Sequence, residues 1–184
     1  MRSRTGTLVA AASTVIVLAA VSTVALAAAG TGFRHRSRAP SGQCSAPGLA
    51  GEVVDVTLTN MGGGAMMRGS VGGMMRVLVN RHQVAAGTVS LRVANTGSLV
   101  HELVVMPLAP DQQVGDRSVG ADNRVDETGS VGEASHTCAA SGGDGIEPGA
   151  LGWATLDLPA GRYELLCNLT GHYAGGMYTE LTVS

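Results

Sequence analysis

The chain has 184 residues, a length that suits one ordinary domain plus a targeting segment and is too short for two full domains. Only 14% of the residues are charged and the net charge is -2 with no basic stripe, so nucleic acid is not an expected partner. Gly is abundant, with 27 residues clustered between short apolar runs, which is typical of many short strands joined by tight turns.

The first 30 residues are a predicted targeting segment. Arg2 and Arg4 precede an uncharged apolar stretch, residues 8–29, which ends in small residues that suit a signal-peptidase site. The stretch also reaches the roughly 20 residues that a helix needs to cross a bilayer, so a retained membrane anchor is the alternative. A signal helix and an anchor helix would both put the rest of the chain outside the cytoplasm, either secreted or held at the outer face of the cytoplasmic membrane.

A linker and a single domain are predicted to follow. Residues 31–51 are rich in Gly, Ser, Pro and Arg and predict the linker, and residues 52–184 carry the pattern of the domain. The apolar pattern predicts strands at residues 52–59, 74–80, 88–94, 99–106, 153–158, 162–167 and 178–183. Short strands without a long helix predict an all-β fold, a Greek-key β-sandwich.

Residues 107–150 show little periodicity and form a predicted excursion from the sandwich, with room for a short helix. Loops of this length are usually functional or tied down. Cys138 lies in the excursion and is one of three cysteines, with Cys44 and Cys167. The simplest pairing in an exported protein is a Cys44–Cys138 disulfide, which leaves Cys167 for another purpose. Three unpaired thiols are the alternative, which export disfavours because thiols tend to oxidise there.

The segment that carries chemistry runs from Tyr163 to Met177. It places Cys167, His172 and Met177 at a spacing of Cys-x4-His-x4-Met, at the end of a predicted strand and in the loop after it. A blue-copper site that transfers electrons needs two His and one Cys in a trigonal plane, with a weak axial Met. His101, which follows a turn in an otherwise apolar strand, supplies the second His. Each residue alone suits an ordinary core or loop position, but together they predict copper rather than structural zinc, which normally has no Met ligand.

These residues resemble the cupredoxin family over about residues 52–184. The stretch from Asn95 to His101 resembles the family's turn before its upstream His, and the stretch from Pro159 to Cys167 resembles its Pro-x-Gly-x-Tyr-x-x-x-Cys segment. The Cys-x-x-x-Gly-His-x4-Met form that begins at Cys167 is similar to the ligand loops of the rusticyanin- and sulfocyanin-like members. The resemblance implies one type 1 copper ion on the four ligands.

Two positions depart from the family pattern. Glu102 stands where many members have Asn or Asp after the upstream His, and Thr170 stands where many have Pro before the Gly-His pair. Both positions adjoin ligands, so we expect them to tune the reduction potential and to leave ligation intact.

The expected function is to carry single electrons between redox partners outside the cytoplasm. The resemblance implies that the exposed edge of His172 is the electron port, and redox proteins would dock weakly near it. Copper oxidases and nitrite reductases of similar fold have a His beside the thiolate ligand, whereas Leu166 and Asn168 flank Cys167 here. We therefore expect an electron carrier and not an enzyme, and we expect a monomer.

Copper delivery outside the cytoplasm is the alternative function. Met residues cluster in the Gly-rich segment 61–75, and their thioethers could bind Cu(I). A flexible loop with core-filling Met side chains is the simpler interpretation of that segment. His35, His82 and His136 are expected to be solvated loop residues and not ligands.

Overall fold

The structure, a computed structural model, describes residues 44–60 and 75–184. The predicted targeting segment, most of the linker and residues 61–74 of the Met-rich segment lie outside these described residues. All of the described residues belong to one compact unit, Arg38–Ser184. Within the described ranges, no helix has both the length and the apolar character needed to cross a bilayer.

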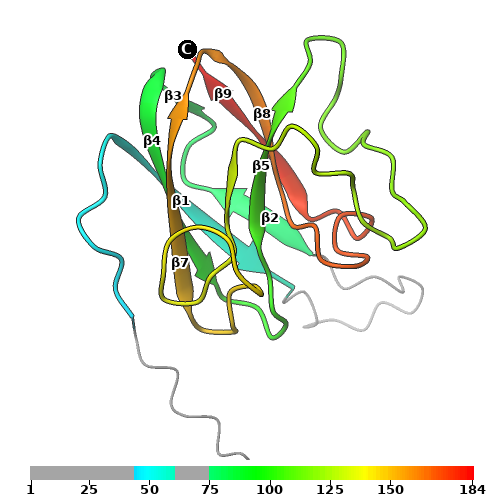
Figure 1. Cartoon of the computed structure of the whole chain (residues 1–184), viewed down its shortest axis with the longest axis horizontal. Helices are drawn as coiled ribbons and strands as arrows, with labels where there is room; N and C mark the ends of the chain where they lie inside the picture. Colours follow the sequence, from blue (N-terminus) through cyan, green and yellow to red (C-terminus); the bar gives the residue numbers. More distant parts are fainter. Residues whose placement is uncertain (1–43, 61–74) are drawn as a thin grey trace, which may run out of the picture. The chain divides into compact units, whose positions relative to one another are not determined.

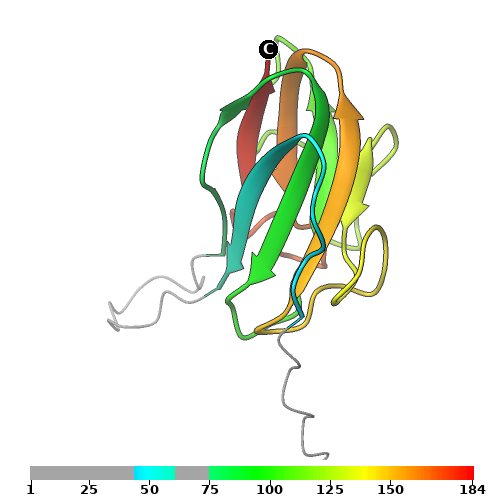
Figure 2. The same cartoon turned by 90° about the vertical axis from the view of Figure 1, so that its left-hand side faces the viewer.

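The described residues form a sandwich of two β-sheets (Figure 1). The four-stranded sheet has the order β2-β1-β4-β7, with β1 Glu52–Thr59, β2 Arg76–Val79, β4 Gly87–Asn95 and β7 Leu151–Leu158. The five-stranded sheet has the order β3-β9-β8-β5-β6, with β3 Gln83–Val84, β5 Leu103–Leu108, β6 Gly132–Ala134, β8 Gly161–Leu166 and β9 Tyr178–Val183. In Figure 2, β1, β4 and β7 lie side by side in front of the second sheet. The predicted all-β sandwich is confirmed.

Alternation of apolar residues explains how the sheets pack. In β1, Val54, Val56 and Leu58 are buried while their neighbours along the strand are partly or fully exposed, so one face of the strand contacts the core. The adjacent β4 pairs parallel with β1 and antiparallel with β7. The core between the sheets is built mainly from Val and Leu, in keeping with the scarcity of aromatic residues in the sequence.

The structure corrects the prediction in the middle of the chain. β5 begins at Leu103 and not at residue 99, because Leu99 is exposed and His101 pairs only through an isolated bridge to Ile146. The excursion at residues 107–150 contains the short strand β6, which pairs with β5, and no helix. β3 lies between the strands predicted at residues 74–80 and 88–94, where no strand was expected, and it pairs with β9.

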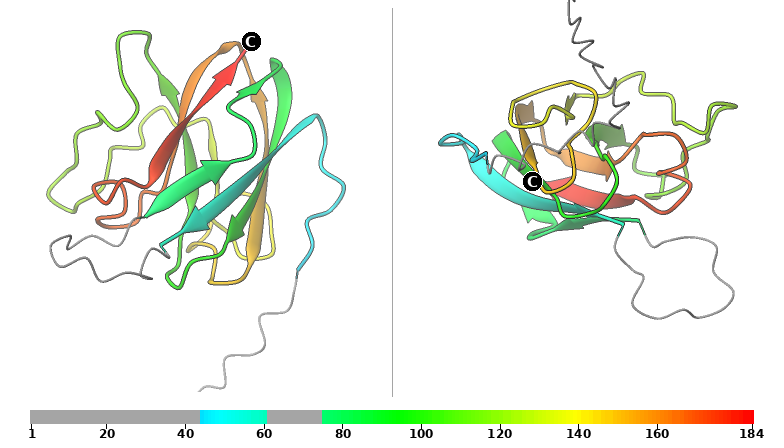
Figure 3. Two further views of the ribbon diagram at one scale, coloured as in Figure 1. Left: turned by 180° about the vertical axis from the view of Figure 1, so that it is seen from behind. Right: turned by 90° about the horizontal axis from the view of Figure 1, so that it is seen from below.

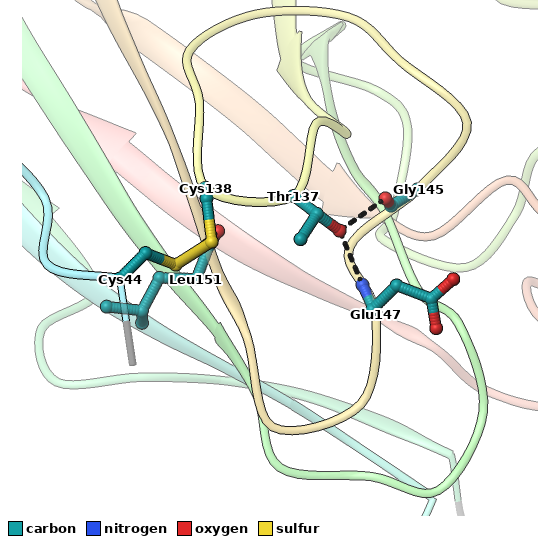
Figure 4. Close-up of a disulfide and its surroundings, with 6 residues drawn as sticks. All are labelled: Cys44, Thr137, Cys138, Gly145, Glu147 and Leu151. Carbon is teal, nitrogen blue, oxygen red and sulfur yellow. Dashed lines mark hydrogen bonds between the residues drawn. A yellow bond between two sulfur atoms is a disulfide. The ribbon is translucent and has the colours of Figure 1, made fainter. Parts of the chain in front are cut away.

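A disulfide between Cys44 and Cys138 ties the excursion to the segment before β1 (Figure 4). The two Cα atoms are 5.5 Å apart, and the bridge spans 94 positions of sequence. Next to it, the Thr137 hydroxyl donates to the carbonyl of Gly145 and accepts the amide of Glu147. The predicted pairing is confirmed, and the third cysteine is free and buried.

Strand ends bring the predicted ligands to one end of the sandwich. β8 ends at Leu166 and β9 begins at Tyr178, and these two residues are partners in the antiparallel register. The residues just beyond them, Cys167 and Met177, are therefore neighbours on adjacent extensions of the two strands. On its other side β8 pairs with β5, which begins two residues after His101.

Candidate metal centre

Three of the four predicted ligands converge. The Cys167 sulfur lies 3.2 Å from His172 Nδ1 and 4.0 Å from His101 Nδ1, and the two Nδ1 atoms are 3.2 Å apart. The two imidazole rings meet edge to face, with centroids 5.0 Å apart. The structure thus assembles one thiol and two imidazoles around a single point.

The triangle of ligand atoms has the size of a metal site. A point equidistant from its corners lies about 2 Å from each, close to metal–nitrogen bond lengths and slightly short of metal–sulfur ones. A thiolate with two imidazoles is a donor set that suits copper. Met177 is fully buried in the same apolar cluster as Cys167, and its carbonyl accepts the Cys167 amide at 3.0 Å. The residues present fit copper, and the axial role of the Met177 thioether stays a prediction.

Hydrogen bonds fix the backbone that carries His101. Its amide donates to the Ile146 carbonyl at 3.2 Å, and its own carbonyl accepts the Ile146 amide at 2.6 Å. The Asn95 side chain begins the preceding turn, donating to the carbonyls of Leu99 and Ile146 and accepting the Gly97 amide. The Asn-containing turn that the sequence singled out is therefore joined to the excursion, which supplies Ile146.

Asn60, which no sequence motif marks, lies against the far side of the His101 ring. Its Oδ1 is 3.3 Å from His101 Nε2 and accepts the amides of Ser98 at 2.7 Å and Leu99 at 3.4 Å. An acceptor at Nε2 favours the tautomer with its proton there, which leaves the Nδ1 lone pair free for a metal. A Cβ at Gly97 would come within 2.2 Å of this oxygen, so the position has no room for a side chain.

Tight turns shape the loop between Cys167 and Met177. The His172 amide donates to the Leu169 carbonyl at 2.8 Å, and the Met177 amide donates to the His172 carbonyl at 3.2 Å. Gly171 has a φ of 80°, a conformation that glycine adopts without strain. These turns keep the His172 ring beside the Cys167 sulfur.

Burial keeps both imidazoles neutral at neutral pH. Burial, with a smaller contribution from His172, lowers the pKa of His101 to about 4, and burial also lowers the pKa of His172. Burial raises the pKa of the Cys167 thiol to about 12. Without a metal the site holds two neutral rings and a protonated thiol, so metal binding must release the thiol proton.

Glu102 links the two segments that carry the ligands. Its amide donates to the Cys167 sulfur at 3.4 Å, and its carboxylate accepts the Asn168 amide at 3.1 Å. The residue is 7% exposed, and burial, followed by the negative charge of Glu127, raises its pKa to about 7. The departure from the cupredoxin pattern therefore places a buried carboxyl group next to the thiol.

Of the remaining histidines, His82 and His136 lie in the described part of the chain and do not join the ligand group. His82 Nδ1 lies 3.0 Å from the Glu180 carbonyl, and His136 is an exposed residue bridged to Gly145. His35 lies outside the described residues.

Comparison with known families identifies the domain. A family model described as the Sulfocyanin (SoxE) domain matches residues 53–184, most of the chain. The chain belongs to the sulfocyanin family. Sulfocyanins are blue copper proteins of the cupredoxin type and act as electron carriers, not as enzymes. The predicted resemblance and the predicted cofactor, copper, are confirmed.

Several solved structures are similar to this sulfocyanin domain. Reduced auracyanin from Roseiflexus castenholzii is 20% identical, with 74% of this chain and 99% of that chain covered and a TM-score of 0.43. Reduced rusticyanin is 20% identical, with 77% and 88% covered and a TM-score of 0.42. Auracyanin A from Chloroflexus aurantiacus is 16% identical, with 72% and 99% covered and a TM-score of 0.43. No curated protein matches the sequence.

Proposed function

We propose that this sulfocyanin-family chain binds one copper ion through His101, Cys167, His172 and Met177 and carries single electrons between redox proteins outside the cytoplasm. The observation that carries the proposal is the triangle of the Cys167 sulfur and the two His Nδ1 atoms, with sides of 3.2, 3.2 and 4.0 Å. Membership of the sulfocyanin family supports copper and electron transfer. The choice of the four ligands, the redox partners and the location are not given by family membership and belong to the proposal.

The residues around the site suit an electron carrier. Copper bound here would supply a one-electron Cu(II)/Cu(I) couple. His101, Cys167 and Met177 are fully buried, so the surrounding protein excludes water from three of the proposed ligands. Exclusion of water favours the less charged reduced state and raises the reduction potential.

His172 is the proposed port for electrons. It is the partly exposed member of the ligand set, whereas the other three are fully buried. Its neighbours Gly171, Ala174 and Gly175 are small and uncharged, so a partner could approach the ring edge closely. We place docking of redox proteins here, through the small contact area typical of transient electron-transfer complexes, with the chain acting as a monomer.

The proposed location is outside the cytoplasm. The Cys44–Cys138 disulfide supports it, because disulfides persist mainly in oxidising compartments. Residues 1–30 would form a signal helix or an anchor helix, and residues 31–51 would link it to the copper domain at residues 52–184. For the fold, we further propose that the strands of the sandwich are connected in a Greek-key order.

Copper delivery is the second candidate function, because Met75 lies against the ligand loop. A Cβ at Gly175 would be 3.3 Å from the Met75 sulfur, and the two residues line one cavity together with Tyr178. A thioether at this position could pass Cu(I) to or from the site. The rest of the Met-rich segment, residues 61–74, lies outside the described residues. Delivery predicts that Met75→Leu slows the exchange of Cu(I), whereas a simple carrier predicts no change.

A Cu(II) titration of the full chain tests the proposed function. We expect an intense visible thiolate-to-copper band that saturates at one equivalent and is absent from a Cys167→Ser variant. A colourless product, or a band that survives in Cys167→Ser, would exclude the blue-copper assignment.

A further inference from the structure

A buried polar cluster holds Tyr173, the residue that follows His172. Glu164 on β8 is 0% exposed, and its carboxylate accepts the Tyr173 hydroxyl at 2.9 Å, the Gly115 amide at 2.7 Å and Arg117 Nε at 2.5 Å. The Tyr173 hydroxyl in turn accepts the Arg117 amide at 3.0 Å. A buried carboxylate is tolerated only when it is paired and hydrogen-bonded, and here the excursion supplies the partners.

A second set of bonds holds the first residue of the ligand loop, Asn168, next to Cys167. Asn168 is 2% exposed, and its Oδ1 accepts the Val125 amide at 2.7 Å. Its Nδ2 donates to the Val125 carbonyl at 2.8 Å and to the Glu127 carboxylate at 2.7 Å. The side chain of Asn168 therefore pairs with the backbone of the excursion as a strand neighbour would.

Both sets of bonds end on one segment of the excursion, residues 115–127. In the middle of the ligand loop, the Gly171 amide donates to the Asn123 carbonyl at 2.9 Å. The Tyr173 ring also packs in a small apolar cluster with Val125. Figure 3 shows the excursion, in light green, running beside the orange-red ligand loop. The excursion thus holds the loop at its first residue, Asn168, and near its centre, at Gly171 and Tyr173.

We propose that residues 115–127 form a clasp that holds the ligand loop, residues 168–177, in its metal-binding conformation before copper arrives. Tyr173 and Asn168 are its positioning residues, because they carry the grip to the adjacent ligands His172 and Cys167. The proposal rests on copper binding at these ligands, as argued above, but the conformation of the loop is measurable without copper.

The clasp matters because the loop has little intrinsic order. Three of its residues, Gly171, Gly175 and Gly176, are glycines, which lose more conformational entropy on ordering than other residues. A loop already held in its bound conformation does not pay that cost when the ligand binds, and the ligand dissociates more slowly. Hydrogen bonds remote from the ligand atoms should therefore slow the release of copper.

Hydrogen exchange of the metal-free protein tests the clasp. Tyr173→Phe removes one hydroxyl and keeps the ring, so the fold should survive. Tyr163→Phe is the matched control. Tyr163 lies on β8 and is buried like Tyr173, and its hydroxyl donates one hydrogen bond, to the Pro159 carbonyl at 2.9 Å. Loss of the two hydrogen bonds of the Tyr173 hydroxyl should make the amides of residues 168–177 exchange about five- to 100-fold faster in Tyr173→Phe, and these amides should be unchanged in Tyr163→Phe.

Copper release provides a second readout. Transfer of Cu(I) to a competing chelator should be about five- to 100-fold faster from Tyr173→Phe than from Tyr163→Phe. Glu164→Gln keeps the shape of the side chain but not the charge that pairs with Arg117. It should likewise release Cu(I) faster than its matched control. Its matched control is Glu180→Gln on β9, which breaks the partly exposed pair with Arg162 on β8.

Equal exchange of the ligand loop in Tyr173→Phe and Tyr163→Phe would overturn the clasp, as would an increase spread evenly over the whole domain. A selectively faster loop in a protein that binds no copper would leave the clasp standing and refute the proposed function instead. The two proposals therefore fail by different results.

Discussion

The two histidines of the proposed site place the same ring atom, Nδ1, near the Cys167 sulfur but are held differently. His101 is fully buried, and its Nε2 faces Asn60 Oδ1 at 3.3 Å. His172 is partly exposed, and its position depends on the turns of the ligand loop. The buried ring is suited to fixing the geometry of the site, and the exposed ring to exchanging electrons with a partner.

Asn60→Ala tests whether the contact between Asn60 and His101 Nε2 contributes to copper affinity. Loss of the acceptor leaves the tautomer and tilt of the ring less well defined, so copper affinity should fall by about 10- to 100-fold. Competition with a chelator of known affinity measures it. Asn80→Ala is the matched control, because Asn80 likewise holds a backbone amide, that of Asp55 at 3.0 Å, but lies next to β2. Equal affinities in the two variants would contradict a role for Asn60.

Glu102 should make the stability of the metal-free protein depend on pH. Burial raises its pKa from 4.5 to about 7, so the folded state holds the proton more tightly than the unfolded state. Its contribution to stability is therefore fully present below about pH 4.5 and is lost as the pH rises through about 7. Glu102→Gln removes this titration. The lowered pKa of His101 affects the stability of the wild type and of the variant equally, so its effect cancels in the difference between them.

The free energy of unfolding of Glu102→Gln relative to the wild type should thus rise by about 3 kcal/mol from acid to mildly alkaline pH. Urea unfolding of both metal-free proteins over that range measures the difference. A difference that does not change with pH would mean that the carboxyl group titrates normally.

Among the elements, β4 connects the core to the copper site. It pairs with β1 and β7 and ends at Asn95, which begins the turn before His101. Leu91 in its middle is 0% exposed, whereas Leu78 on the edge strand β2 is 47% exposed. Leu91→Ala should lower the free energy of unfolding by about 2–5 kcal/mol through the cavity it leaves, and Leu78→Ala by about 0.5 kcal/mol or less. Chemical denaturation that finds equal losses would contradict the assigned core.

Sequence patterns located those elements that have a regular alternation. β1 and β9 begin and end where the prediction placed them, because apolar and polar residues alternate in β1 and β9 follows directly after Met177. β6 has only three residues and exists because β5 offers it an edge, so no local pattern marks it. The start of β5 was wrong because the burial of His101 depends on the excursion and not on its own strand.

The same distinction holds for the candidate site. Cys167, His172 and Met177 lie within one short motif, and His101 follows a recognisable turn, so the sequence was sufficient to select them. Asn60 and Glu164 could not be selected, because each acts on a residue that only the fold brings near it. Motifs therefore led to the proposed ligands, and the structure was needed to find the residues that hold those ligands in place.

At the scale of the whole molecule, the Cys44–Cys138 disulfide closes most of the domain into one covalent loop. A double Cys44→Ser, Cys138→Ser variant should lose about 2–5 kcal/mol of stability in chemical denaturation, because its unfolded chain is less constrained. The visible band of its copper form should be unchanged, since the ligands come from other segments. Unchanged stability would contradict a structural role for the disulfide, and a changed band would show that it acts on the site.

The most direct test of the electron-carrier account is a potentiometric titration of the copper-loaded full chain, followed by visible absorption and by assay of bound copper. The account predicts one reversible one-electron step, with the band lost on reduction and restored on reoxidation while one copper ion stays bound throughout. Loss of copper on reduction, or the absence of a reversible step, would contradict electron carrying and favour copper delivery.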